Sequence, residues 1–158
     1  MPDFEEIKLG GEAYMYVDPQ GIDAETPAWD ELDLIQDADL NLEKDEVDVS
    51  VRRSKLFKLA MGGKIGASFE FQIPWLPTDT AFAALFAVWN RTAAKKYIGV
   101  AILDDSIENG GEGLLADMDV LQFNRAEHQT EGMVANIVLK PTYSPNNPRW
   151  ATAGGSEW

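Results

Sequence analysis

The stretch from Ala38 to Ile73 constrains this chain most, because apolar and polar residues alternate along nearly all of it. Successive side chains of a β-strand point to opposite faces, so this period of two predicts strands with one covered face. The apolar positions are Leu40, Leu42, Val47, Val49, Val51, Ile65, Ala67, Phe69, Phe71 and Ile73. The acidic first half turns basic at Arg52 and Arg53, and no catalytic motif lies within it. We therefore interpret the stretch as an assembly surface built of strands.

The composition predicts one globular domain. The chain has 158 residues, of which 45% are hydrophobic and 25% are charged. It contains no cysteine, which excludes a disulfide scaffold and a thiol nucleophile. The acidic N-terminus lacks the pattern of a signal peptide, and the longest apolar run, residues 81–89, is too short to span a bilayer. We expect no membrane association.

The net charge of −14 is concentrated at the beginning of the chain. Residues 1–48 hold 16 acids and two lysines, whereas acids and bases balance over residues 49–158. This distribution argues against adhesive contact with nucleic acid, which needs a basic surface. It permits a surface past which nucleic acid slides without sticking. The alternative is that the acidity only keeps the protein soluble.

The order of the predicted elements is several strands, one helix and then more strands. Strands are predicted over residues 13–17, 38–43, 47–51 (or an extended arm), 56–61, 64–73, 97–103, 114–124 and 133–143. Gly62-Gly63 is interpreted as a hairpin turn, and the change of parity at Leu121 and Phe123 as a β-bulge. These strands are too closely spaced for βαβ crossovers throughout. The fold class is therefore mainly β: an antiparallel β-sandwich or barrel flanked by one α-helix.

The helix is predicted over residues 80–91, with Thr78 or Asp79 as its N-cap. Its expected core face follows the helical spacing of Phe82, Leu85, Phe86 and Trp89. Three regions result from these predictions. They are an acidic N-terminal arm with the first strand (1–28), the β-sandwich with its helix (29–143) and a flexible C-terminal tail (144–158).

Few residues suggest chemistry. Asp37 to Asn41 resembles the start of a calcium loop, but Leu42 stands where such a loop needs glycine. The single histidine, His128, cannot build a histidine-rich metal site. Asp117 and Asp119 share one face of a strand and could form a carboxylate pair for glycoside hydrolysis, but we favour two solvent-facing residues. We predict no enzyme, no catalytic residue, no metal and no cofactor.

The order of these segments resembles that of the major tail tube proteins of long, non-contractile-tailed (siphovirus-type) bacteriophages. The resemblance is carried by Trp29, by Asp37–Leu42, by Asp45–Arg52, which includes Val-Asp-Val-Ser-Val-Arg, and by the alternating strand Gly62–Ile73 before the helix. It covers about residues 29–143, and no single motif in it is diagnostic.

The resemblance implies a structural virion protein that assembles into stacked, hexameric rings, which form the tail tube and the conduit for DNA ejection. It implies tape-measure, tail-terminator and baseplate proteins as partners, and DNA that passes through the lumen without specific binding. The implied location is the virion tail, after the host cytoplasm. Alternatives are another ring- or tube-forming component (a tail terminator, a baseplate hub or a secretion tube) and, last, a carbohydrate-binding β-sandwich.

Charge and exposed apolar residues select the candidates for the subunit interface. A basic cluster directly after an acidic third gives each subunit two oppositely charged parts, which head-to-tail stacking could pair. Trp29 lies in an acidic loop, where either a partner or the open end of its own barrel could bury it. The candidates are Trp29, Glu46, Val47, Asp48, Val49, Val51, Arg52, Arg53, Lys55 and Lys58.

Overall fold

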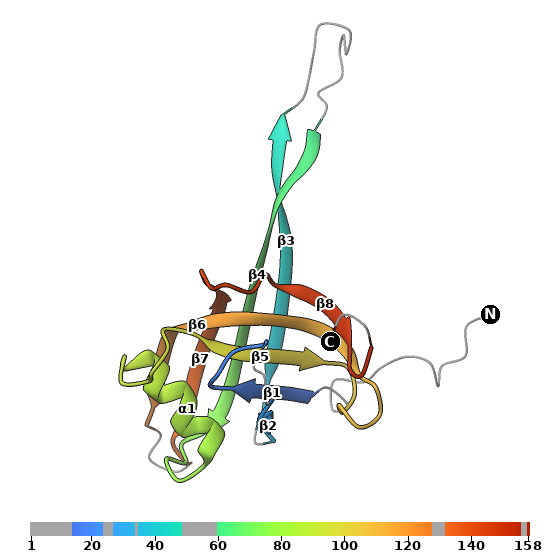
Figure 1. Cartoon of the computed structure of the whole chain (residues 1–158). Helices are drawn as coiled ribbons and strands as arrows, with labels where there is room; N and C mark the ends of the chain where they lie inside the picture. The colour runs from blue at the N-terminus through green and yellow to red at the C-terminus, as the bar shows by residue number, and fades with distance from the viewer. Residues whose placement is uncertain (1–13, 24–26, 34, 49–59, 128–131, 156–157) are drawn as a thin grey trace, which may run out of the picture.

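A computed structural model describes residues 14–23, 27–33, 35–48, 60–127, 132–155 and 158 of the chain. Within these residues, eight strands form one antiparallel sheet beside one α-helix, which confirms the predicted fold class (Figure 1). The elements are β1 (Tyr14–Asp18), β2 (Asp30–Glu31), β3 (Ala38–Asp48), β4 (Ala60–Pro74), α1 (Thr80–Trp89), β5 (Ile98–Leu103), β6 (Glu112–Ala126), β7 (Val134–Pro141) and β8 (Arg149–Thr152).

The sheet has the strand order β2-β1-β5-β6-β7-β4-β3, with β8 also paired to β6. The long strand β6 joins its two halves, because its first part pairs with β5 and β8 and its second part with β7. A register shift between Val120 and Gln122 confirms the predicted bulge. In Figure 1, β1, β5 and β6 run across the view while β3, β4 and β7 run up it, so the sheet folds over onto itself.

The main core lies between these two halves of the sheet and under α1. Inward-facing residues of β4 and β7 (Phe69, Phe71, Ile137) meet residues of β5 and β6 (Val100, Met118), and all five are buried. A second, smaller cluster covers the opposite face of β1, β5 and β6. Strand β5 is therefore covered on both faces, which suits its unbroken apolar sequence.

The helix forms where it was predicted, with Asp79 as its N-cap, but its buried face is different. The buried residues are Ala81, Phe82, Leu85 and Val88. Phe86 and Trp89, both expected in the core, are 39% and 44% exposed. Phe86 instead lies at the edge of an aromatic cluster, in which its ring centroid is 5.4 Å from that of Phe123. The spacing identified the helix but placed its core stripe about one position too far along the chain.

Two further predictions, at Gly62-Gly63 and over residues 144–158, were wrong. Strand β4 runs straight through Gly62 and Gly63, where a hairpin turn was expected. The expected tail over residues 144–158 contains β8, which pairs with β6 from Glu112↔Thr152 to Leu115↔Arg149. Ala151 and Ala153 are buried in the smaller cluster. The first strand also belongs to the body, because β1 pairs with β5 along its whole length.

Candidate functional site

The β3–β4 hairpin extends far beyond the rest of the molecule (Figure 1). Near the body, β4 is buried at Phe69, Phe71 and Ile73. Farther out, every residue of β3 from Asn41 to Asp48 is exposed, as is almost all of β4 from Ala60 to Gly66. The outer half of this hairpin therefore packs on no other described element of its own chain.

A bulge divides the hairpin into two parts that present their apolar residues on opposite faces. Leu42 is opposite Ala67 and Lys44 is opposite Ile65, whereas beyond the register shift Val47 is opposite Met61. Side chains alternate along β3, so Leu42 and Val47 lie on different faces. At the bulge a Cβ on Gly63 would lie 3.1 Å from the Val47 side chain, tighter than ordinary packing.

The exposed apolar side chains make the hairpin a candidate interaction surface. Leu42, Val47, Met61 and Ile65 are 48%, 43%, 59% and 68% exposed. Strand β3 is also the last strand of the sheet, so its outer edge pairs with no described strand. An apolar surface of this kind, next to an open strand edge, is typical of sites that another protein covers. Met61 and Ile65 were not among the predicted interface candidates, because the glycine pair between them was interpreted as a turn.

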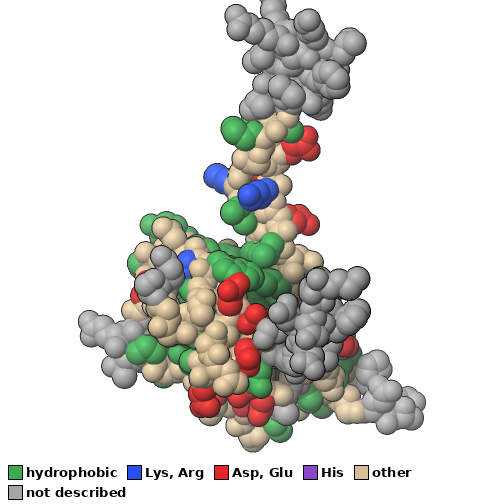
Figure 2. All heavy atoms as spheres, turned by 90° about the vertical axis from the view of Figure 1, so that its right-hand side faces the viewer, with side chains coloured by type: hydrophobic (Ala, Val, Ile, Leu, Met, Phe, Trp, Pro, Cys, Tyr) green, Lys and Arg blue, Asp and Glu red, His purple; other side chains and the backbone are tan. Residues whose placement is uncertain are grey.

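Charged residues lie between the apolar ones on the hairpin. Figure 2 shows basic and acidic side chains interleaved with hydrophobic ones along its length. Asp39 is directly opposite Glu70, a like-charge pair that weakens the hairpin where it leaves the body. Such a pair adds negative charge to this face of the hairpin.

The predicted interface residues fall into three groups. Glu46, Val47 and Asp48 lie together at the outer end of β3, and all three are exposed. Six candidates lie outside the described residues: Val49, Val51, Arg52, Arg53, Lys55 and Lys58. Trp29 directly precedes β2 and is partly buried against the smaller core cluster. Its ring centroid is 5.8 Å from that of Trp158, so its own chain covers part of it.

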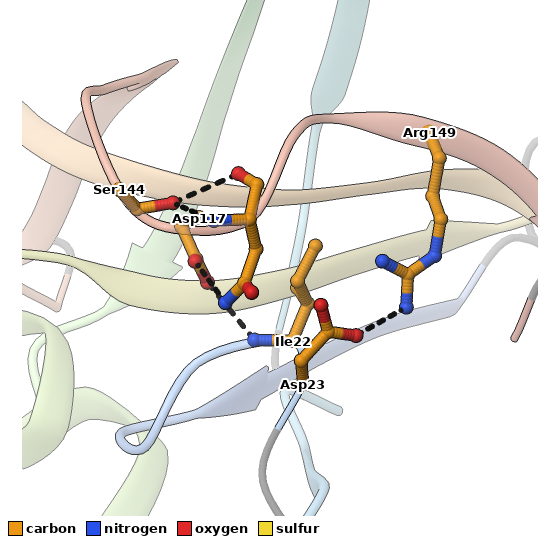
Figure 3. A network of polar contacts seen from close by, with 6 residues as sticks. Ile22, Asp23, Asp117, Ser144 and Arg149 are labelled. Atoms are coloured by element: carbon orange, nitrogen blue, oxygen red, sulfur yellow. Dashed lines mark hydrogen bonds and ion pairs between the residues drawn. The ribbon is translucent and has the colours of Figure 1, made fainter.

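Asp117 and Asp119, the two residues weighed as a carboxylate pair, differ in their surroundings. Asp117 is buried, against our expectation of a solvent-facing residue, whereas Asp119 is only partly buried. One oxygen of Asp117 accepts a hydrogen bond from the N–H of Ile22 at 2.9 Å, and the other accepts one from Nδ2 of Asn146 at 3.0 Å (Figure 3). These bonds satisfy the buried carboxylate, and they fasten two loops to β6.

Two more contacts strengthen the same corner of the body. Arg149 at the start of β8 pairs with Asp23 at 2.8 Å (Figure 3). Asp18, also buried, accepts the N–H groups of Gln20 and Ala28 at 2.9 and 3.0 Å. These acidic side chains shape the loop that leads to Trp29. The corner is therefore a structural clamp, and the described residues hold no cluster of His, Asp or Glu suited to a metal ion.

Comparison with solved structures identifies the architecture. The chain matches the SPP1 tail tube with a TM-score of 0.70 at 13% identity, covering 91% of this chain and 78% of that one. It matches the tail of an empty gene transfer agent particle, refined with six-fold symmetry, with a TM-score of 0.68 at 11% identity, covering 87% and 96%. The chain has the tail-tube fold. It also matches the baseplate of the anti-feeding prophage, with a TM-score of 0.58 at 8% identity over 95% of both chains.

The comparisons by sequence add nothing to this likeness. No protein-family model and no curated protein matches the chain. The tail-tube fold is therefore visible in the arrangement of strands and helix, while sequence identity to these structures is only 8–13%. In the part of the chain that the structure describes, no helix is long and apolar enough to cross a membrane.

Proposed function

We propose that this chain is a structural subunit of a phage-type tail, and that it assembles with copies of itself into stacked hexameric rings. The observation that carries the proposal is the projecting hairpin, which combines exposed apolar side chains with an open strand edge on a tail-tube fold. Such a hairpin is poorly suited to an isolated protein, because an uncovered apolar strand edge invites association. Burial against neighbouring subunits removes that liability.

The acidic surface supports a passive role toward DNA. The hairpin face that carries Asp39, Glu43 and Glu70 would repel a polyanion, so DNA passing through a lumen lined by it would not be held. In this proposal the tube conducts DNA during ejection without binding it. Tape-measure, tail-terminator and baseplate proteins would be its partners, and the subunit would move from the host cytoplasm into the virion tail.

Electron microscopy of the purified protein tests the proposal. We expect negatively stained samples to show tubes or stacked rings with a central channel. Replacing Met61 and Ile65 together by aspartate should prevent stacking, because their side chains are 59% and 68% exposed and would be buried only in an assembly. The control is Tyr143→Asp, which alters a side chain that is 97% exposed on the body. Featureless small particles of the unaltered protein under all conditions would contradict the proposal.

A second candidate is a ring-forming baseplate or terminator component. The likeness to the anti-feeding prophage baseplate supports it, although the TM-score is lower than those of the tail structures. The same micrographs separate the two candidates, since a component of this kind would give isolated rings that do not stack. A carbohydrate-binding β-sandwich ranks last, and it would give neither rings nor tubes.

A further inference from the structure

A cleft of about 600 Å³ lies at the base of the hairpin, where the two ends of the sheet come together. Residues of β1 and β2 line one side, and Leu40 and Phe69 of the hairpin line the other. Several lining side chains are apolar and buried, among them Met15, Leu32 and Phe69. The cleft therefore offers an apolar floor to anything that enters it.

The rim of the cleft is acidic. Glu31, Asp33 and Asp37 line it, and all three are exposed. An occupant that suits both parts must bring apolar side chains for the floor and positive charges for the rim. One segment of this chain has that composition. Residues 49–59, which join β3 to β4, contain four basic residues, no acidic residue and five apolar ones.

We propose that the cleft receives residues 49–59 of a second copy of this chain, with Arg52 and Arg53 facing the acidic rim. This inference rests on the proposed self-assembly and names the surface that receives the hairpin. The N-terminal residues 1–13 are a poorer occupant, although they lead directly to Tyr14 at the cleft, because they carry four acids and one lysine.

The length of the hairpin requires that the occupant comes from another copy. Leu40 is the outermost β3 residue that lines the cleft, and β3 continues to Asp48. Eight residues of strand span about 27 Å at 3.4 Å per residue. An 11-residue connection, folded back along its own hairpin, reaches at most about 20 Å. A copy displaced along the hairpin avoids this limit.

The resulting contact joins two different surfaces, the outer end of one hairpin and the base of the next. A heterologous contact closes into a ring only when its rotation returns to the starting level, and a displacement along the hairpin prevents that, so each new subunit presents a fresh cleft or a fresh hairpin. The cleft and the connection are at opposite ends of the same hairpin, so the hairpin length sets the spacing between copies. The geometry therefore fits contacts between successive rings.

Cysteine cross-linking tests the contact directly, because the chain has no cysteine of its own. One population carries Asp33→Cys and the other Arg53→Cys, and the two are mixed, assembled and oxidised. We expect cross-linked heterodimers on denaturing gels. The matched control replaces Asp33→Cys by Glu108→Cys, an exposed carboxylate that does not line the cleft, and should give none.

Charge reversal tests the energetic role of the rim. Asp33→Lys with Asp37→Lys should raise the protein concentration needed for assembly at least about tenfold. Adding Arg52→Glu and Arg53→Glu to the same chain should restore most of this loss at low salt. Glu108→Lys with Glu127→Lys changes the net charge equally, outside the cleft, and should have a much smaller effect. An unchanged unfolding midpoint of each variant confirms that it folds.

The outcomes separate the two proposals. Tubes that form without heterodimer cross-links overturn the cleft as the receiving surface and leave the proposed function standing. A cross-link from Asp33→Cys to Leu9→Cys in the same chain, in place of the one to Arg53→Cys, identifies residues 1–13 as the occupant and also overturns it. Failure of the unaltered protein to associate at all overturns both proposals.

Discussion

Strand β5 and the outer half of β3 belong to the same sheet but differ in almost every physical respect. All six residues of β5, Ile98–Leu103, are buried, whereas Asn41–Asp48 of β3 are all exposed. The sequence of β5 is continuously apolar, while the outer half of β3 is mostly charged, with Leu42 and Val47 as its only apolar residues. The body therefore contains the stabilising burial of this chain, and the hairpin depends mainly on its own ladder of hydrogen bonds. The difference places the stabilising burial in one region, and we propose that the other serves assembly.

The largest effect separating the two regions is expected from Leu85→Ala in α1. Leu85 is fully buried, so removing its side chain should lower the free energy of unfolding by about 2–5 kcal/mol. Leu42→Ala makes the same chemical change on the hairpin, where the side chain is 48% exposed. The hairpin variant should change the stability of the free subunit by no more than about 0.5 kcal/mol. Urea unfolding of the Leu85→Ala and Leu42→Ala variants measures the two losses of stability. Equal losses would contradict the assignment of stability to the body.

A smaller loss is expected where the body's loops are fastened. Asp117→Ala leaves the N–H of Ile22 and the amide of Asn146 without their acceptor, which should cost about 1–3 kcal/mol. Asp119→Ala, two residues along β6 and less buried, is the control. Urea unfolding and amide hydrogen exchange at Ile22 should both report the difference. Similar values for the two variants would show that the clamp contributes little.

Tyr16 gives a third test, which depends on pH. Burial raises the pKa of Tyr16, while the hydrogen bond that its hydroxyl accepts from Ile107 N–H at 3.3 Å lowers it. Because the folded pKa lies above the unfolded value near 10, ionisation is easier in the unfolded chain. The stabilising contribution is thus complete below pH 10, and it is lost as pH rises through the folded pKa.

Tyr16→Phe should remove this loss at high pH, and at neutral pH it should cost about 0.5–1.5 kcal/mol through the missing hydrogen bond. Tyr143→Phe is the control, because that side chain is 97% exposed. Unfolding curves between pH 8 and about pH 11 measure both variants. If Tyr16→Phe keeps the full pH dependence of the unaltered protein, another group is responsible.

The smallest free-energy change per interaction is expected for the ion pairs of the basic cluster in residues 49–59. Surface ion pairs are worth about 0–1 kcal/mol each, and salt screens them over about 8–10 Å. If Arg52 and Arg53 join subunits, assembly should weaken as salt rises, and Arg52→Glu with Arg53→Glu should weaken it at low salt. Light scattering during polymerisation measures both. A double variant that assembles normally at low salt would show that the cluster has no assembly role.

The strands of the body could be predicted because burial leaves a clear pattern in their sequence. The parity change at Leu121 and Phe123 predicted the bulge in β6, and the alternation from Lys64 to Ile73 predicted the inner part of β4. The helix was also predicted within two residues at its end. In each case local spacing and the tertiary environment favour the same structure.

The remaining features depend on contacts between distant residues. The buried position of Asp117 is set by a loop 95 residues earlier in the chain, and β8 exists because β6 offers it an edge. Gly62-Gly63 has the composition of a turn, yet it continues β4 because β3 pairs with it up to Asp48. The cleft was not predicted either, since its lining brings together Met15 of β1 and Phe69 of β4, which are far apart in the sequence.

The outer half of the hairpin packs on no described part of the core, so its length can change without disturbing the core. Deleting one residue from each strand beyond Leu42 would shorten its reach by about 3.4 Å and turn the outermost side chains to the other face. Deleting two from each would shorten it by about 6.8 Å and keep every face as it is. The repeat distance of a tube held by this hairpin could thus change in steps of two residue pairs, while the subunit itself keeps its melting temperature.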